Sequence, residues 1–165
     1  FTVFCFVPLF YFSSSSVAAN QFLARDDRVM GGSSQSAIVY SSTSVSSILT
    51  AQSPTRDLSL CVGLCIDAMQ HTNWTWKVGI RTTASEQSGV YWSSSFVPST
   101  ERSTCLLPFE DFVPMYRGRI KEGNGKLDSS DISSIRLMLS KSANPKFVET
   151  GAFSLCLFNI AGVLK

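Results

Sequence analysis

The feature of this sequence that most restricts its fold is a repeated alternation of apolar and polar residues, while the spacing typical of amphipathic helices is nearly absent. Because side chains on a strand point alternately to the two faces of a sheet, each such run can bury one face and expose the other. The pattern therefore predicts a β protein. The apolar positions are Leu60, Val62, Leu64, Ile66 and Ala68; Trp74, Trp76, Val78 and Ile80; Ile135, Leu137 and Leu139; and Phe153, Leu155 and Leu157.

Segments rich in glycine, proline, serine and asparagine separate these runs. The loop from Ser85 to Gly89 leads into a further apolar run, Val90 to Phe96, which predicts a β-hairpin with the run before it. Asn144-Pro145 marks a turn between the last two runs. Short strands without intervening helices predict an all-β fold of two antiparallel sheets packed face to face, a jelly-roll-like sandwich.

A length of 165 residues suits one such domain, expected over residues 9–165, and leaves no room for a second. The sequence begins with Phe1 and not with methionine, and residues 1–8 are expected to be either a targeting remnant or an extra strand. The apolar run from Phe1 to Phe12 is shorter than the ~20 residues that cross a bilayer, and its composition favours a strand at Leu9 to Phe12.

The charge distribution argues against nucleic acid as a partner. Fourteen lysines and arginines against twelve acidic residues give a net charge of +2, with the signs mixed along the chain. The longest basic block runs only from Arg117 to Lys121. A protein that binds nucleic acid needs a concentrated basic face to displace phosphate counterions.

Cysteine usage and the scarcity of catalytic motifs lead us to expect no metal site, no cofactor and no enzymatic activity. The five cysteines lack the spacing of a disulfide framework, so reduced structural thiols are expected. Cys61 and Cys65, near the single His71, would lie roughly 13 Å apart on a strand, too far for one zinc ion to bridge. Glu110 and Asp111 would point to opposite faces of an extended chain, and no G-x-S-x-G motif occurs.

Gly31-Gly32 is the first candidate for contact with a partner. The two glycines allow positive φ angles and close backbone approach. They predict either a tight turn into the next strand or a cradle of backbone N–H groups for a partner, with Met30 and Ser33 beside it.

The second candidate lies in the irregular stretch from Pro108 to Asp131, whose length is typical of functional or disordered loops. Arg117, Arg119 and Lys121 occupy alternate positions, so an extended chain would form a basic ridge beside Tyr116. Such a ridge suits an acidic protein surface or anionic lipid headgroups, the latter as a peripheral membrane contact, whereas the alternative is a solvated loop. Among the aromatic residues, Trp74 and Trp76 share the apolar face of their run, which favours core packing over sugar stacking; Trp92 stays open.

Several blocks of this sequence resemble the CIA30 family, the complex I intermediate-associated protein 30 domain, and they follow in the family's order from Leu9 to Val163. The most specific are DRVMGGSSQS and the block around PFEDFVP. The blocks are Asp27 to Ser36; Trp76 to Thr82; Pro108 to Pro114 with Tyr116 to Arg119; Ile132 to Leu139; and Gly151 to Ile160.

The resemblance implies a galactose-binding-domain-like sandwich and a role as an assembly factor or scaffold that binds subunits or intermediates of a large membrane complex. In mitochondria that complex is NADH:ubiquinone oxidoreductase. In plastids, similar domains are fused to a Rossmann unit and linked to photosystem biogenesis, but this sequence has no G-x-G-x-x-G fingerprint. A mitochondrial location is expected, with the chloroplast as the alternative. A carbohydrate-binding module on the same fold is the competing hypothesis.

Overall fold

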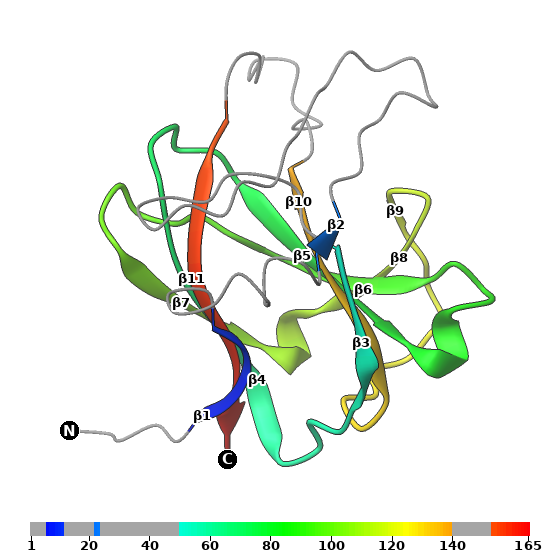
Figure 1. Cartoon of the computed structure of the whole chain (residues 1–165). Coiled ribbons are helices and arrows are strands. Elements are labelled where there is room, and N and C mark those ends of the chain that lie inside the picture. Colours follow the sequence, from blue (N-terminus) through cyan, green and yellow to red (C-terminus); the bar gives the residue numbers. More distant parts are fainter. Residues whose placement is uncertain (1–5, 12–21, 24–49, 140–152) are drawn as a thin grey trace.

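Two antiparallel sheets form a β-sandwich, as the alternating pattern predicts (Figure 1). The structure is a computed structural model that describes the backbone of residues 6–11, 22–23, 50–139 and 153–165, and side chains from residue 57 onwards. All strand pairs within the two sheets are antiparallel. The smaller sheet has the order β1-β11-β4-β7, with β1 at Phe6–Tyr11, β11 at Leu155–Leu164, β4 at Cys61–Gln70 and β7 at Ser103–Pro108.

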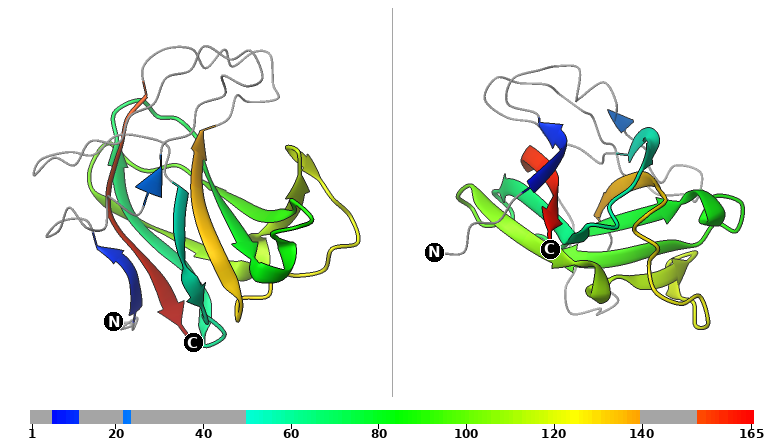
Figure 2. Two further views of the ribbon diagram at one scale, coloured as in Figure 1. Left: turned by 45° about the vertical axis from the view of Figure 1, so that its right-hand side comes forward. Right: turned by 90° about the horizontal axis from the view of Figure 1, so that it is seen from below.

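The larger sheet carries the predicted hairpin at its centre. β5 and β6 are joined by the predicted loop, which begins with a short 3-10 turn, η2, at Thr83–Ser85. Figure 2 shows the hairpin of β8 and β9 at the edge of this sheet that lies far from β1 and β11. The order is β2-β3-β10-β5-β6-β8-β9, with strands at Phe22–Leu23, Thr50–Arg56, Ile132–Leu139, Trp76–Thr82, Tyr91–Phe96, Val113–Tyr116 and Arg119–Ile120.

The hydrophobic core lies between the two sheets and is built by the predicted apolar faces. Trp76, Val78 and Ile80 of β5 are fully buried, and they belong to one cluster with Leu64 and Ile66 of β4. Burying one large apolar side chain contributes about 1.5–3 kcal/mol, so this cluster supplies a large part of the drive to fold. Core packing of Trp76 is thereby confirmed, and Trp92 also lies in the cluster, with 7% of its surface exposed.

At the start of β4 the predicted burial is wrong. Leu60 and Val62 were expected to face the core, yet they are 72% and 47% exposed. The pairing with β11 is irregular here: Gly63 lies opposite Val163, but Cys61 lies opposite Leu164, so Val62 is an extra residue in β4. Such a bulge reverses the alternation. Cys61 is therefore buried in the core in place of its two apolar neighbours.

The stretch from Pro108 to Asp131 is not the continuous loop that the sequence suggested. It contains a 3-10 turn, η3, at Phe109–Asp111, followed by β8 and β9. Glu110 and Asp111 are exposed within that turn and not extended. The edge strand β7 was also missed, because only two of its six residues, Cys105 and Leu107, turn toward the core.

At the N-terminal end, β1 covers Phe6–Tyr11 and pairs with β11, so the predicted strand begins three residues earlier than expected. Whether residues 1–8 also include part of a targeting peptide stays a prediction. The Asn144-Pro145 turn lies outside the described residues, and β10 and β11, the strands on its two sides, belong to different sheets.

The β8–β9 hairpin turns through Arg117 and Gly118. Tyr116 pairs with Arg119, which leaves a two-residue loop, and both loop residues have positive φ angles, 50° for Arg117 and 79° for Gly118. Two positive φ angles are the signature of a type I′ turn, which matches the twist of the flanking strands. Glycine adopts this conformation without strain, whereas arginine does so at a cost.

One buried polar side chain joins the two sheets at an end of the sandwich. Gln70, the last residue of β4, is fully buried. Its Nε2 donates to the carbonyl oxygens of Trp74 and Pro98, both at 2.9 Å. Its Oε1 accepts from the Trp74 N–H at 2.9 Å and from Nε1 of Trp76 at 3.1 Å. All four hydrogen-bonding positions of this amide are thus used.

We expect Gln70→Leu to lower the free energy of unfolding by about 3 kcal/mol, because two donors and two acceptors would lose their partner in a site closed to water. Urea unfolding measures this loss. Gln87→Leu is the matched control: Gln87 is exposed, so its change should stay within about 0.5 kcal/mol. Equal urea midpoints for the two variants would show that the Gln70 amide does not contribute to the free energy of unfolding.

We expect Arg117→Asn to raise the free energy of unfolding by about 0.5 kcal/mol, because asparagine tolerates a positive φ angle better than arginine. This expected gain is the net value, after subtraction of the contact between Arg117 and the Tyr116 ring, which is worth about 0.5 kcal/mol at an exposed site. Arg119→Asn removes the same charge from strand β9 and should give no gain. Urea midpoints that fall equally in both variants would contradict the strain at Arg117.

Candidate functional site

A cleft of about 510 Å³ opens on the face of the large sheet that points away from the core. Its floor holds side chains from the three central strands: Arg81 of β5, Tyr91 of β6, and Arg136 and Met138 of β10. These positions alternate with the buried residues of the same strands, so the polar face of each run builds the cleft. One wall is the loop of residues 86–89, and the other is residues 116–118 of the β8–β9 hairpin.

Gly79 shapes the floor between the two arginines. A Cβ atom at this position would lie 2.9 Å from Cε of Met138 and 3.2 Å from the Tyr91 ring. The glycine therefore lets Met138 and Tyr91 lie directly on strand β5 and form an apolar patch in a site that is otherwise cationic.

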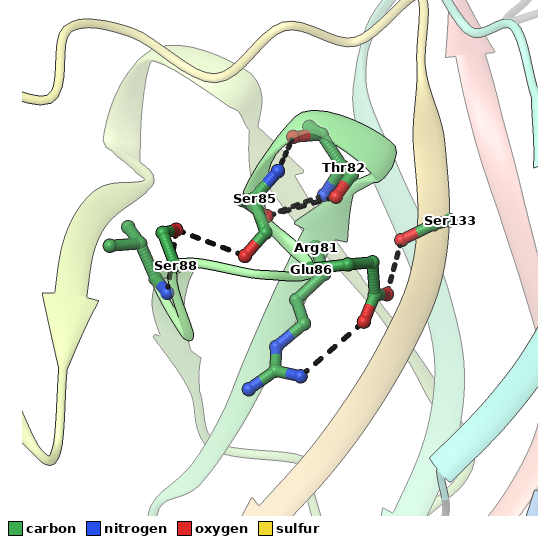
Figure 3. A network of polar contacts seen from close by, with 7 residues as sticks. Arg81, Thr82, Ser85, Glu86, Ser88 and Ser133 are labelled. Atoms are coloured by element: carbon green, nitrogen blue, oxygen red, sulfur yellow. Dashed lines mark hydrogen bonds and ion pairs between the residues drawn. The ribbon is translucent and has the colours of Figure 1, made fainter.

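The loop wall is held by a compact network of hydrogen bonds (Figure 3). Thr82 and Ser85 cap the 3-10 turn reciprocally: the Ser85 N–H donates to Oγ1 of Thr82 at 3.2 Å, and the Thr82 N–H donates to Oγ of Ser85 at 3.0 Å. Oγ of Ser88 donates to the Ser85 carbonyl at 3.0 Å. Because these bonds are local and partly buried, the loop that carries Glu86 has a defined position relative to β5.

Arg81 and Glu86 form the ion pair at this wall. Nη1 of Arg81 lies 3.6 Å from Oε2 of Glu86, and the other carboxylate oxygen accepts a hydrogen bond of 2.7 Å from Oγ of Ser133 (Figure 3). The Arg81 side chain is 20% exposed, and its buried Nε has no hydrogen-bond partner among the described residues. The carboxylate is thus shared, and it compensates the guanidinium charge only partly.

Four predicted contact residues lie in the β8–β9 hairpin, but they do not form an extended ridge. The chain turns back at Arg117, so Arg117 and Lys121 come together at the Tyr116 ring instead, with Cζ of Arg117 5.2 Å and Nζ of Lys121 5.1 Å from its centroid. Both are cation–π distances. Arg119 lies in β9 and lines, with exposed Ile120, a second hollow of about 490 Å³ on the hairpin.

Only two of these four residues, Tyr116 and Arg117, also line the main cleft. The other predicted contact residues, Met30, Gly31, Gly32 and Ser33, lie outside the described residues, and their role stays a prediction.

Sequence reasoning missed Arg81, Glu86, Tyr91 and Arg136. A signal for the arginines was present: they occupy polar positions of two apolar runs, and Arg136 lies opposite Gly79 in the pairing of β10 with β5. Finding the site would have required the strand order, which the alternation does not contain.

Three cysteines of the described residues have the character of structural thiols. Burial raises the pKa of Cys61, Cys65 and Cys105, so these thiols stay protonated at neutral pH and are poor nucleophiles and metal ligands. His71 is exposed in the loop after β4. In the described ranges no three His, Cys, Asp or Glu side chains are grouped so that they could hold a metal ion. The same ranges hold no helix with the length and hydropathy of a membrane span.

A family profile and a yeast protein match the sequence of this chain. The sequence profile described as Complex I intermediate-associated protein 30 (CIA30) matches residues 10–157. Uncharacterized protein C9E9.15 of Schizosaccharomyces pombe is 28% identical over 174 aligned positions, which cover 87% of this chain and 78% of the yeast protein.

Among solved structures, the family 11 carbohydrate-binding module of the cellulosomal cellulase Lic26A-Cel5E of Clostridium thermocellum superposes with a TM-score of 0.54 at 18% identity. The same module in complex with a β-1,3-1,4-mixed-linked tetrasaccharide gives a TM-score of 0.55, and each comparison covers 79% of this chain and 81% of the module. At this identity the likeness concerns the fold, a galactose-binding-like β-sandwich. Because the family profile extends over most of its length, the chain belongs to the CIA30 family of complex I intermediate-associated proteins.

Proposed function

We propose that this chain is a non-catalytic protein-binding domain that acts as an assembly factor or scaffold for a large membrane complex, the mitochondrial NADH:ubiquinone oxidoreductase. The observation that carries the proposal is membership of the CIA30 family across residues 10–157. The cleft of the large sheet supports it, because a concave surface with fixed walls and mixed cationic and apolar lining is suited to hold a protein segment.

The chemistry of the cleft supports binding over catalysis. Glu86 is the one carboxylate among its described lining residues, and both of its oxygens are engaged, one by the Arg81 guanidinium and the other by the Ser133 hydroxyl. A general base needs a free face toward the substrate. A carboxylate engaged in this way is better suited to orient Arg81 than to reach a substrate.

Two alternatives remain within the proposal. One places the chain in the chloroplast, as a factor for photosystem biogenesis of the same family. The other is a carbohydrate-binding module, favoured by the fold likeness and by Tyr91 at the cleft, since aromatic rings can stack on sugars. Trp92 is unsuited to that role because its ring belongs to the core, so Trp92→Ala would test folding instead of glycan contact.

Affinity capture of the tagged chain from organelle membranes of its own cells should recover subunits of NADH:ubiquinone oxidoreductase, quantified by mass spectrometry. A tagged Gln70→Leu chain serves as the control for specificity, because a domain with a disrupted sandwich should lose this recovery. Photosystem subunits in place of respiratory ones would move the proposal to the chloroplast.

Recovery of neither set of subunits, combined with glycan-array binding that disappears in Tyr91→Ala, would replace the assembly role by the carbohydrate-binding alternative. Tyr91 is half-buried at the cleft floor and stands outside the core cluster, so this variant is expected to stay folded. If the chain binds no glycan on the array, the carbohydrate-binding alternative is excluded.

A further inference from the structure

We propose that the cleft on the outer face of the large sheet binds an acidic segment of a partner protein, with carboxylates on its arginines and an apolar side chain on its floor. The inference rests on the proposed function, because it names what part of a protein partner this surface recognises. The residues that carry it are Arg81 and Arg117, with Tyr91 and Met138 beside them.

The charge of the cleft is the first argument. Among the residues that the structure describes, three arginines and one carboxylate, Glu86, line it, although the whole chain is nearly neutral. These guanidinium groups come from β5, from β10 and from the β8–β9 turn, so a ligand in the cleft would meet cations on its floor and at one wall. Guanidinium groups bind carboxylates through paired N–H donors, which gives geometric selectivity as well as attraction.

The incomplete compensation of Arg81 is the second argument. Its one ion-pair contact in the described part of the chain is 3.6 Å long, and Glu86 directs its other oxygen to Ser133. Nε of Arg81 is buried without a partner in the same part, as is Oγ of Ser134, the residue opposite Arg81 in the strand pairing. A partly desolvated cation with so little compensation gains more from an incoming anion than a solvated one does.

The apolar floor distinguishes the expected ligand from a free anion. Met138 and the Tyr91 ring lie against β5 at Gly79 and give the floor an apolar surface. A volume of about 510 Å³ accommodates a few side chains and not a folded domain. The matching ligand is a short segment in which acidic residues flank an apolar one.

The Tyr116 ring argues against a neutral glycan as the ligand. A sugar binds an aromatic ring through the ring face, and Arg117 and Lys121 already lie over the Tyr116 ring at 5.2 and 5.1 Å. Cations in that position compete with a stacked sugar, whereas they add to the attraction for a carboxylate.

The test uses the purified chain and fluorescent peptides in which glutamates flank one leucine, with peptides carrying glutamines in their place as the neutral probe. We expect saturable binding of the acidic peptide by fluorescence anisotropy, weakening with added salt. Arg117→Asn should reduce the affinity about threefold as an exposed wall charge, and Arg81→Gln about tenfold as a partly buried one. Arg119→Asn removes an equal charge from the same hairpin outside the cleft and should have little effect.

Arg117→Asn keeps the test independent of folding, because this variant is expected to be more stable than the original chain. The proposal would be overturned if Arg117→Asn and Arg119→Asn lost the same affinity for the acidic peptide, or if the neutral peptide bound as well as the acidic one. It would also be overturned if the chain bound a mixed-linkage glucan tetrasaccharide and Arg81→Gln abolished that binding. If the acidic peptides did not bind but complex I subunits were still captured, only the role of the cleft as the acidic-segment site would be rejected. Peptide binding without that capture would reject the assembly role and leave the acidic-segment site standing.

Discussion

The hydrogen-bonded amide of Gln70 is the constraint on which the relation between the two sheets depends. It ends the central strand of the small sheet and accepts from the indole N–H of Trp76, the first residue of the central strand of the large one. The same side chain holds the connection between these two strands through Trp74, and the connection between β6 and β7 through Pro98. Hydrophobic burial brings the sheets together without directing them, whereas these directional bonds select one arrangement.

That arrangement decides what the outer face of the large sheet can do. With the apolar positions of β5 and β10 turned to the core, Arg81 and Arg136 must lie on the opposite face. The order β10-β5-β6-β8 then brings the loop after β5 and the turn after β8 to the two sides of the arginines. The cleft is therefore a consequence of strand order and not of any single motif.

The two most specific blocks of the CIA30 resemblance differ in whether the structure describes them. The block around Pro108 to Arg119 builds a 3-10 turn and the β8–β9 hairpin, and it contributes Tyr116 and Arg117 to the cleft. The segment from Asp27 to Ser36 lies outside the described residues, so it belongs to the part of the chain that matches the family without a structural role being assigned to it.

The sequence by itself determined the fold class, most of the apolar faces that form the core, and the family, because these depend on local alternation and on ordered blocks. It did not reveal the strands β7, β8 and β9, whose residues show little apolar alternation. It could not predict the bulge at Val62, since one extra residue in a strand is visible only against the strand it pairs with. It also could not bring Arg81, Arg136 and Tyr116 together, because they lie on three strands whose neighbours are chosen by packing across the sandwich. Tertiary structure alone decided the site, since long-range pairing and not local preference sets which polar faces adjoin.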